Sequence, residues 1–227
     1  VLWINVYDNR VGYRVFTSPN PVGPFTAIAQ PTLAVNANAP VADLNNGDHD
    51  LFVDDDDTAY LAYTDWRTGG AIVIEKLNAD YTSGTGQYVY VTTGATEAPA
   101  MMKRNGKYYI LYSDPNRGYD TTGTSYRTAT SLLGSWSSGI KISTASCGGQ
   151  PSFVSTIKLG SEVIFRYGSD LWNNGAVNEA LANFYWAPLT FAADGSINPI
   201  LRQNEVTVAI PPDTNSPPVL TGLDSSS

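Results

Sequence analysis

Three polar residues recur along the chain at nearly equal intervals, and two of them carry carboxyl groups that could do acid–base chemistry. Glu97 follows Asp48 by 49 residues, and Gln150 follows Glu97 by 53 residues. Glu97 lies among small apolar residues in the segment Thr96 to Ala100, and such surroundings desolvate a carboxyl group and raise its pKa. A carboxyl group of this kind can act as a general acid, and a second carboxylate, Asp48, would raise the pKa further and orient the acid. The alternative interpretation is that Glu97 is an ordinary surface carboxylate.

A repeat of about fifty residues indicates which elements would position these side chains. Apolar, strand-like runs end in a tyrosine closely followed by an aspartate at Tyr7-Asp8, Tyr63 to Asp65, Tyr112 to Asp114 and Tyr167 to Asp170. Turn sequences precede the last three runs, among them Asn105-Gly106, which strongly favours a β-hairpin. A repeat of this length built from short strands is typical of a β-propeller, whereas a β-sandwich explains the strands but not the repeat.

The sequence therefore predicts an all-β fold, a five-bladed β-propeller over residues 1–210. Four repeats are visible, and the segment from Tyr185 to Ile210 implies part of a fifth. The first apolar run, Val1 to Tyr7, has no hairpin partner before it, so we expect the first blade to be incomplete at the N-terminus. Residues 211–227 are rich in Pro, Ser and Asp, which predicts a linker or disordered tail. The segment Val177 to Phe184 is compatible with one or two helical turns.

The propeller places the three polar residues on strands that meet. The first strand of each blade lines the central channel, so equivalent residues of successive blades face one another at its mouth. Asp48, Glu97 and Gln150 occupy such positions, and we expect them to converge at the mouth of the channel. Asp50 is two residues from Asp48 and would point to the same side of its strand, with His49 opposite.

Composition excludes several other classes of protein. Among 227 residues, 13 are Lys or Arg and 21 are Asp or Glu, and the net charge of −8 disfavours binding to nucleic acid or anionic membranes. A single cysteine, Cys147, excludes an internal disulfide framework, and a single histidine, His49, excludes a multi-histidine metal centre. No metal or other cofactor is predicted. Few basic residues beside many Tyr, Ser and Thr are common in secreted proteins, so an extracellular location is expected.

Other conspicuous residues have structural interpretations. The run Asp54 to Asp57 lacks the Gly and the terminal Glu of an EF-hand loop and is interpreted as a solvated hairpin turn. Cys147 is interpreted as an inert buried thiol and His49 as a structural residue. Four tryptophans are expected mostly in the core: Trp66, Trp136, Trp172 and Trp186. One or two of them could lie near the channel mouth and stack on a sugar.

These residues together resemble glycoside hydrolase family 43, a family of five-bladed propellers. Asp48 to Asp56 resembles the family's strand and hairpin with an aspartate at its start. Glu97 to Ala100, followed by the hairpin Lys103 to Tyr109, resembles the general-acid motif. Gly149 to Ser152, with Asp170 to Trp172, is similar to the exo-β-1,3-galactanase branch of the family.

The resemblance implies a role for each of the three polar residues. Glu97 would be the general acid, Asp48 would hold it and keep its pKa high, and Gln150 would lie near the nucleophilic water in place of the usual aspartate base. The implied activity is inverting, exo-acting hydrolysis of β-1,3-galactan with release of galactose, by a secreted enzyme whose partner is a plant or microbial polysaccharide. Further candidates for contact with the sugar are Asp50, Trp172 and Asn116.

Departures from the family pattern keep other functions open. Asp57 stands where the hairpin glycine is usual, Leu171 stands where the branch tends to carry arginine, and the loop Asp114 to Thr124 does not match the branch's substrate-contacting loop. The alternatives are an arabinan- or xylan-active glycosidase of the same family and a carbohydrate-binding propeller without turnover. By the repeat length, the water-activating group is expected before Val1, and a carbohydrate-binding module is a candidate partner beyond the C-terminal linker.

Overall fold

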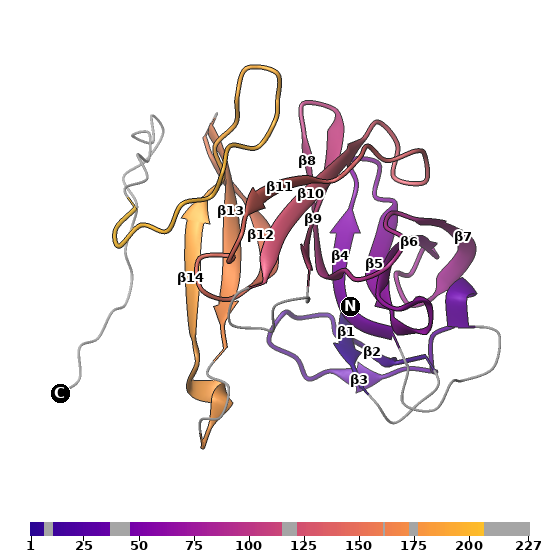
Figure 1. The fold of residues 1–227 in the computed structure, drawn as a ribbon. Helices are drawn as coiled ribbons and strands as arrows, with labels where there is room; N and C mark the ends of the chain where they lie inside the picture. The colour runs from indigo at the N-terminus through magenta and orange to yellow at the C-terminus, as the bar shows by residue number, and fades with distance from the viewer. Residues whose placement is uncertain (7–10, 37–45, 115–121, 161, 173–176, 207–227) are drawn as a thin grey trace.

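The computed structural model describes residues 1–6, 11–36, 46–114, 122–160, 162–172 and 177–206, and within them the regular structure is almost entirely β-strand (Figure 1). The strands form four antiparallel sheets that follow one another in chain order. Within the described residues, three short 3-10 turns accompany them: η1 (Ala34–Asn36), η2 (Trp66–Thr68) and η5 (Glu179–Leu181). The all-β prediction is confirmed. The helical turn considered between residues 177 and 184 is the single turn η5.

Each sheet is a meander of neighbouring strands. The first contains β1 (Leu2–Asn5), β2 (Tyr13–Thr17) and β3 (Thr26–Ala27). The second contains β4 (Asn46–Val53), β5 (Ala59–Asp65), β6 (Ala71–Leu77) and β7 (Gly84–Tyr90). The third contains β8 (Glu97–Arg104), β9 (Lys107–Asp114), β10 (Gly123–Ala129) and β11 (Ile140–Ser143). The fourth contains β12 (Gln150–Leu159), β13 (Glu162–Leu171) and β14 (Asn183–Pro188).

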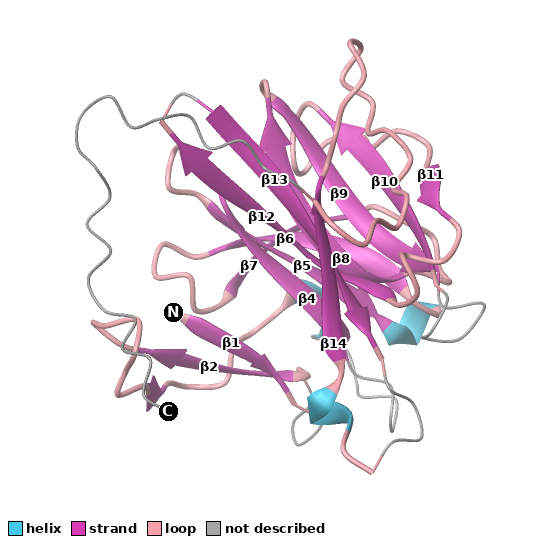
Figure 2. Ribbon diagram, turned by 90° about the vertical axis from the view of Figure 1, so that its left-hand side faces the viewer, coloured by secondary structure: helices cyan, strands magenta, loops and turns pink. Residues whose placement is uncertain are grey.

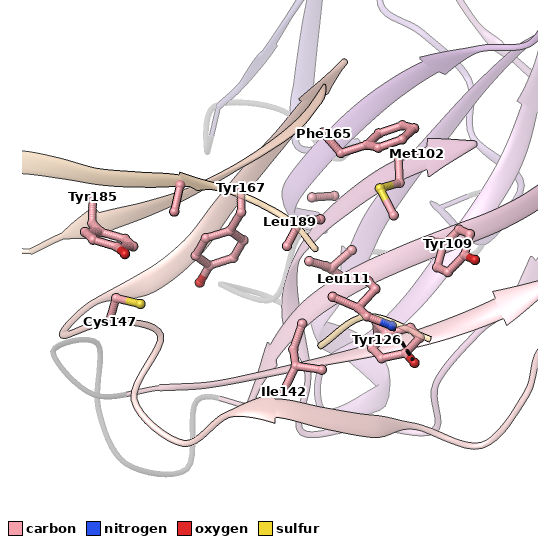
Figure 3. Packing of buried hydrophobic residues seen from close by; sticks show 13 residues of the cluster. Met102, Tyr109, Leu111, Tyr126, Ile142, Cys147, Phe165, Tyr167, Tyr185 and Leu189 are labelled. Atoms are coloured by element: carbon pink, nitrogen blue, oxygen red, sulfur yellow. Dashed lines mark hydrogen bonds between the residues drawn. The ribbon is translucent and has the colours of Figure 1, made fainter. Parts of the chain in front are cut away.

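A hydrophobic core lies between each sheet and the next. Trp3 and Tyr13 of the first sheet pack with Tyr63 of the second, and Ile72 and Ile110 belong to the core between the second and third sheets. The third and fourth sheets share a core whose members converge from both sides in Figure 3, among them Met102, Tyr109, Tyr126, Phe165, Tyr167 and Tyr185. Burial of these large side chains stabilises the stack of sheets because each one removes apolar surface from water.

The inner strands β4, β8 and β12 are neighbours although they belong to different sheets. β8 contacts both β4 and β12, and the three strands run close together in Figure 2. The first six residues of β8 are all buried, as expected for a strand enclosed on both faces. This arrangement brings the starts of three strands, each about fifty residues apart in sequence, to one place.

A buried carboxylate anchors the region between the first two sheets. Glu75 accepts hydrogen bonds from the backbone N–H groups of Ala34 and Gly86 and from the hydroxyl of Tyr63. Burial raises the pKa of Glu75, and the two backbone N–H groups and the Tyr63 hydroxyl oppose that rise. The carboxylate is therefore part of the framework around residue 34 and lies on strand β6, away from the inner strands.

The expectation that most tryptophans are core residues is wrong. All five tryptophans are described, and Trp3 alone is buried. Trp66, Trp136 and Trp172 are half-buried, and the Trp186 side chain is 51% exposed. Trp186 faces outward because it alternates along β14 with Tyr185 and Ala187, which point into the core.

The remaining structural expectations have clear outcomes. Cys147 is a buried thiol, and the ring of His49 packs edge-on against Tyr13 at a centroid distance of 4.9 Å. The run Asp54 to Asp57 forms the β4–β5 hairpin turn, where Asp55 binds the Lys103 ammonium at 2.8 Å. The predicted linker at 211–227, like Tyr7-Asp8, lies outside the described residues. No helix among the described residues is long and apolar enough to cross a membrane.

Candidate active site

The structure brings Asp48, Glu97 and Gln150 together at the starts of β4, β8 and β12. The Gln150 side-chain amide donates a hydrogen bond from Nε2 to Oε1 of Glu97 at 2.7 Å. Oδ2 of Asp48 accepts a hydrogen bond from the backbone N–H of Ala98, the residue after Glu97, at 3.2 Å. These three residues, which are about fifty residues apart in the sequence, are therefore neighbours in space.

Irregular pairing on each inner strand directs these side chains. The register between β4 and β5 shifts between Asn46 and His49, and that between β8 and β9 shifts between Glu97 and Ala100. The register between β12 and β13 shifts at Pro151, next to Gln150. β-Bulges re-aim side chains and are common beside active sites. All three candidate residues lie in or beside such an irregularity.

The bulge after Glu97 includes a backbone conformation that is unusual for a side chain. Ala98 has a φ of 53°, in the left-handed region. Its N–H group is bound by Asp48, so the aspartate stabilises the bulge that directly follows Glu97. Asp48 thus acts on Glu97 in two ways, through its charge and through the backbone.

Burial and charge both raise the pKa of Glu97. Its side chain is 2% exposed, and this desolvation, together with the nearby Asp48 carboxylate, raises the pKa of Glu97 to about 7. The hydrogen bond from Gln150 opposes the rise because it stabilises the charged form. The Asp48 side chain is open to solvent on one side, and the protein atoms around it raise its pKa as well. A carboxyl group with a pKa of about 7 carries a proton over much of the mildly acidic range.

A pocket of about 300 Å³ opens beside the three residues, at the lower end of the size range of small-ligand sites. It is lined by Asn5, Asp48, His49, Ala98, Pro99, Gln150, Pro151, Ser152, Asp170 and Trp172. Glu97 itself is not among the lining residues; its carboxyl group lies directly behind Gln150, which lines the pocket and donates a hydrogen bond to it. A larger cavity of about 670 Å³ lies at the other ends of the strands, beside Phe52, Lys103 and Thr156, and contains none of the three candidate residues.

The predicted sugar-contacting residues have different outcomes. Trp172 lines the pocket, and its position fits a contact with substrate, which stays a prediction. Asp50 lies on the same side of β4 as Asp48, as expected, and its carboxylate accepts a hydrogen bond from the N–H group of Met101 on β8 at 2.6 Å. Burial raises the pKa of Asp50 to about 7. Asp50 is absent from the pocket lining and instead ties β4 to β8. Asn116 lies outside the described residues.

Sequence reasoning missed two participants, Ser113 and Asn5, and did not predict that Trp172 contacts Gln150. Trp172 donates its indole N–H to Oε1 of Gln150 at 3.0 Å, and Gln150 Nε2 also lies 3.3 Å from Oγ of Ser113. Asn5 lines the pocket from β1. Ser113 belongs to the repeated Tyr-x-Asp pattern at the end of β9, so its place in that repeat is a signal that could have pointed to it.

Gly149 sets the position of Gln150 by allowing β12 and β13 to approach closely. A Cβ atom at residue 149 would lie 2.1 Å from the backbone oxygen of Asp170. We expect Gly149→Ala to destabilise the fold by at least about 2 kcal/mol in urea unfolding, because the strand must shift to relieve the clash. Gly106→Ala is the control: a Cβ there has no neighbour within 4 Å, and its positive φ costs only about 1 kcal/mol. Equal stability changes in the two variants would contradict this explanation.

The family model described as "Glycosyl hydrolases family 43" matches residues 5–151. The chain belongs to this family. The match contains Asp48, Glu97 and Gln150, and the resemblance inferred from the motifs is confirmed.

Named relatives of this family 43 chain act on galactose-containing compounds. Beta-D-galactofuranosidase xynD of Aspergillus niger is 34% identical over 139 residues, which are 60% of this chain and 39% of that protein. An exo-beta-1,3-galactanase from Clostridium thermocellum superposes with a TM-score of 0.69 at 25% identity over 82% of this chain and 41% of that one. An exo-beta-1,3-galactanase from Phanerochaete chrysosporium gives a TM-score of 0.61 at 26% identity over 83% and 41%. The chain thus spans less than half of the length of these relatives.

Proposed function

We propose that the protein carrying this chain is a glycosidase that removes galactose from the end of β-1,3-galactan with inversion at the anomeric carbon. The observation that carries the proposal is the Glu97 carboxyl group, which is buried beside Asp48 with a pKa of about 7. Such a group is protonated at mildly acidic pH and can protonate the glycosidic oxygen as it leaves. The two exo-β-1,3-galactanases of similar fold support the choice of substrate.

Asp48 and Gln150 support the acid in this proposal. Asp48 disfavours the ionised form of Glu97 and holds the bulge at Ala98. An inverting glycosidase needs about 6.5–9.5 Å between the acid and the group that activates water. Gln150 Nε2 lies 2.7 Å from Glu97, so no water fits between these two atoms. We therefore assign Gln150 to the positioning of Glu97, and the attacking water to another side of the pocket.

The setting of the site belongs to the same proposal. Four sheets that pack on one another in chain order, with inner strands around one site, support a five-bladed propeller as the complete fold. A galactan substrate supports secretion, because polysaccharides of this kind lie outside the cell. The Pro- and Ser-rich sequence of residues 211–227 supports a linker towards a carbohydrate-binding module.

A second candidate activity is the hydrolysis of β-galactofuranosides. It is favoured by the 34% identity to a beta-D-galactofuranosidase, a higher identity than that to the galactanases of similar fold. The same acid would serve both activities, because protonation of the leaving oxygen does not depend on ring size. The walls of the pocket would then decide between a six-membered and a five-membered sugar ring.

Product analysis with the full-length protein tests the proposal. We expect β-1,3-galactotriose to lose one galactose at a time, with the α-anomer appearing first in proton NMR spectra. Preferential hydrolysis of an aryl β-galactofuranoside would establish the second candidate instead. Release of arabinose or xylose alone from the corresponding oligosaccharides, or binding of galactotriose in calorimetry without hydrolysis, would overturn both.

A further inference from the structure

The Gln150 amide lies between an indole and the candidate acid, and every polar atom of its side chain has a partner. Oε1 accepts from Trp172 Nε1 at 3.0 Å, while Nε2 donates to Glu97 at 2.7 Å and lies 3.3 Å from Oγ of Ser113. We propose that Trp172 is a positioning residue whose indole N–H fixes the orientation of the Gln150 amide, so that the NH2 end faces Glu97. This inference rests on the proposed function, in which Glu97 is the acid.

The chemistry of the groups makes this orientation directional. An indole N–H can only donate, so it can pair with the oxygen end of the amide but not with the nitrogen end. Once the oxygen faces Trp172, the NH2 end must face Glu97. Without the indole N–H, a half-turn of the amide would present its oxygen to Glu97. An ionised carboxylate only accepts hydrogen bonds and cannot pair with that oxygen, whereas a protonated carboxyl group can donate its O–H to it.

The surrounding backbone places Trp172 where it can fulfil this role. Gln150 pairs with Asp170 in the β12–β13 ladder, and Trp172 follows the end of β13. The close approach of the two strands at Gly149 holds this register. The indole is half-buried and lines the same pocket as Gln150, so its N–H group is directed at the amide from within the site.

The orientation of the amide matters because it favours one protonation state of Glu97. The NH2 end stabilises the carboxylate and opposes burial and Asp48, which both raise the pKa of Glu97. Among the described residues, the other charged or titratable groups around the site are Asp50 and His49 on β4, Tyr13 on β2 and Asp170 on β13. Removing the indole N–H would leave these groups in place. A change in the titration of Glu97 would therefore indicate a change in the orientation of the Gln150 amide.

Trp172→Phe in the full-length protein tests the proposal through the pH profile of kcat/KM on β-1,3-galactotriose. Activity requires protonated Glu97 and falls as the pH rises through its pKa. Since the rotated amide stabilises the protonated form, we expect this basic limb to move to higher pH by about one unit, the effect of one hydrogen bond to a charged group. Trp186→Phe, at an exposed tryptophan of the same sheet, is the control and should leave the limb in place.

The background variant Gln150→Leu separates this role from a general loss of structure or from sugar stacking. Trp172→Phe should add no further movement of the limb when Gln150 is already absent, because Trp172 acts through the amide. Should Trp172→Phe not fold, benzothienylalanine at residue 172 removes the N–H group and keeps the ring shape. An unmoved basic limb, or an equal additional movement in the Gln150→Leu background, would overturn the inference. If Glu97→Gln instead keeps full activity, the proposed function itself has failed.

Discussion

Replacing Glu97 by glutamine is expected to lower kcat/KM on β-1,3-galactotriose by about a thousandfold or more. General acid catalysis contributes about 10²–10⁴-fold, and a sugar oxygen is a poor leaving group without a proton. Glutamine matches glutamate in shape, and its oxygen can still accept the hydrogen bond from Gln150, so the site should keep its geometry. The loss would therefore report the missing proton rather than a collapsed pocket.

The matched control for this loss is Glu162→Gln. Glu162 lies at the β12–β13 hairpin, exposed and far along the sheet from Gln150. Both variants remove one negative charge, so any general effect of net charge on binding appears in both. Rates are compared on galactotriose at the pH of maximal wild-type activity. Retention of more than a tenth of wild-type activity in Glu97→Gln would argue against an essential acid at this position.

The same substitution is expected to stabilise the protein at high pH. The pKa of Glu97 is about 7 in the folded protein and near 4.3 in an unfolded chain. The folded form therefore holds a proton more tightly, and the stability that this gives is fully present below pH 4.3 and is lost as the pH rises through 7. At pH 8 the buried carboxylate costs up to about 4 kcal/mol, which glutamine avoids.

Thermal unfolding at two pH values checks this expectation. Glu97→Gln should melt several degrees above the wild type at pH 8 and close to it at pH 4. Glu162→Gln, at an exposed position, should show no such pH-dependent difference. A melting difference that is the same at both pH values would mean that the carboxyl group is not held at a raised pKa.

The sequence predicted the parts of the site that depend on regular repetition. The spacing of Asp48, Glu97 and Gln150 follows from one strand per repeat, and inner strands of successive sheets must be neighbours. The small residues after Glu97 indicated a desolvated carboxyl group, and burial is the first cause of its raised pKa. Composition and turn sequences were sufficient for the all-β fold because strand, turn and hairpin preferences are local.

The parts that the sequence did not predict depend on local irregularity. Asp50 lies on the same side of β4 as Asp48, since both accept hydrogen bonds from the backbone of β8, but the pairing with Met101 keeps Asp50 outside the pocket lining. The contact of Trp172 with Gln150 depends on the approach of two strands at Gly149, which no periodic pattern encodes. Composition alone also could not predict that the Trp186 side chain lies on the exposed face of β14.

The most direct test of the central claim, that Glu97 supplies the proton to the leaving group, is a comparison of leaving groups in the full-length protein. Galactosyl fluoride releases fluoride without protonation by an acid, whereas galactotriose requires a proton on the departing oxygen. We expect Glu97→Gln to lose about a thousandfold in kcat/KM on galactotriose and less than about tenfold on the β-fluoride. An equal loss on both substrates would contradict it.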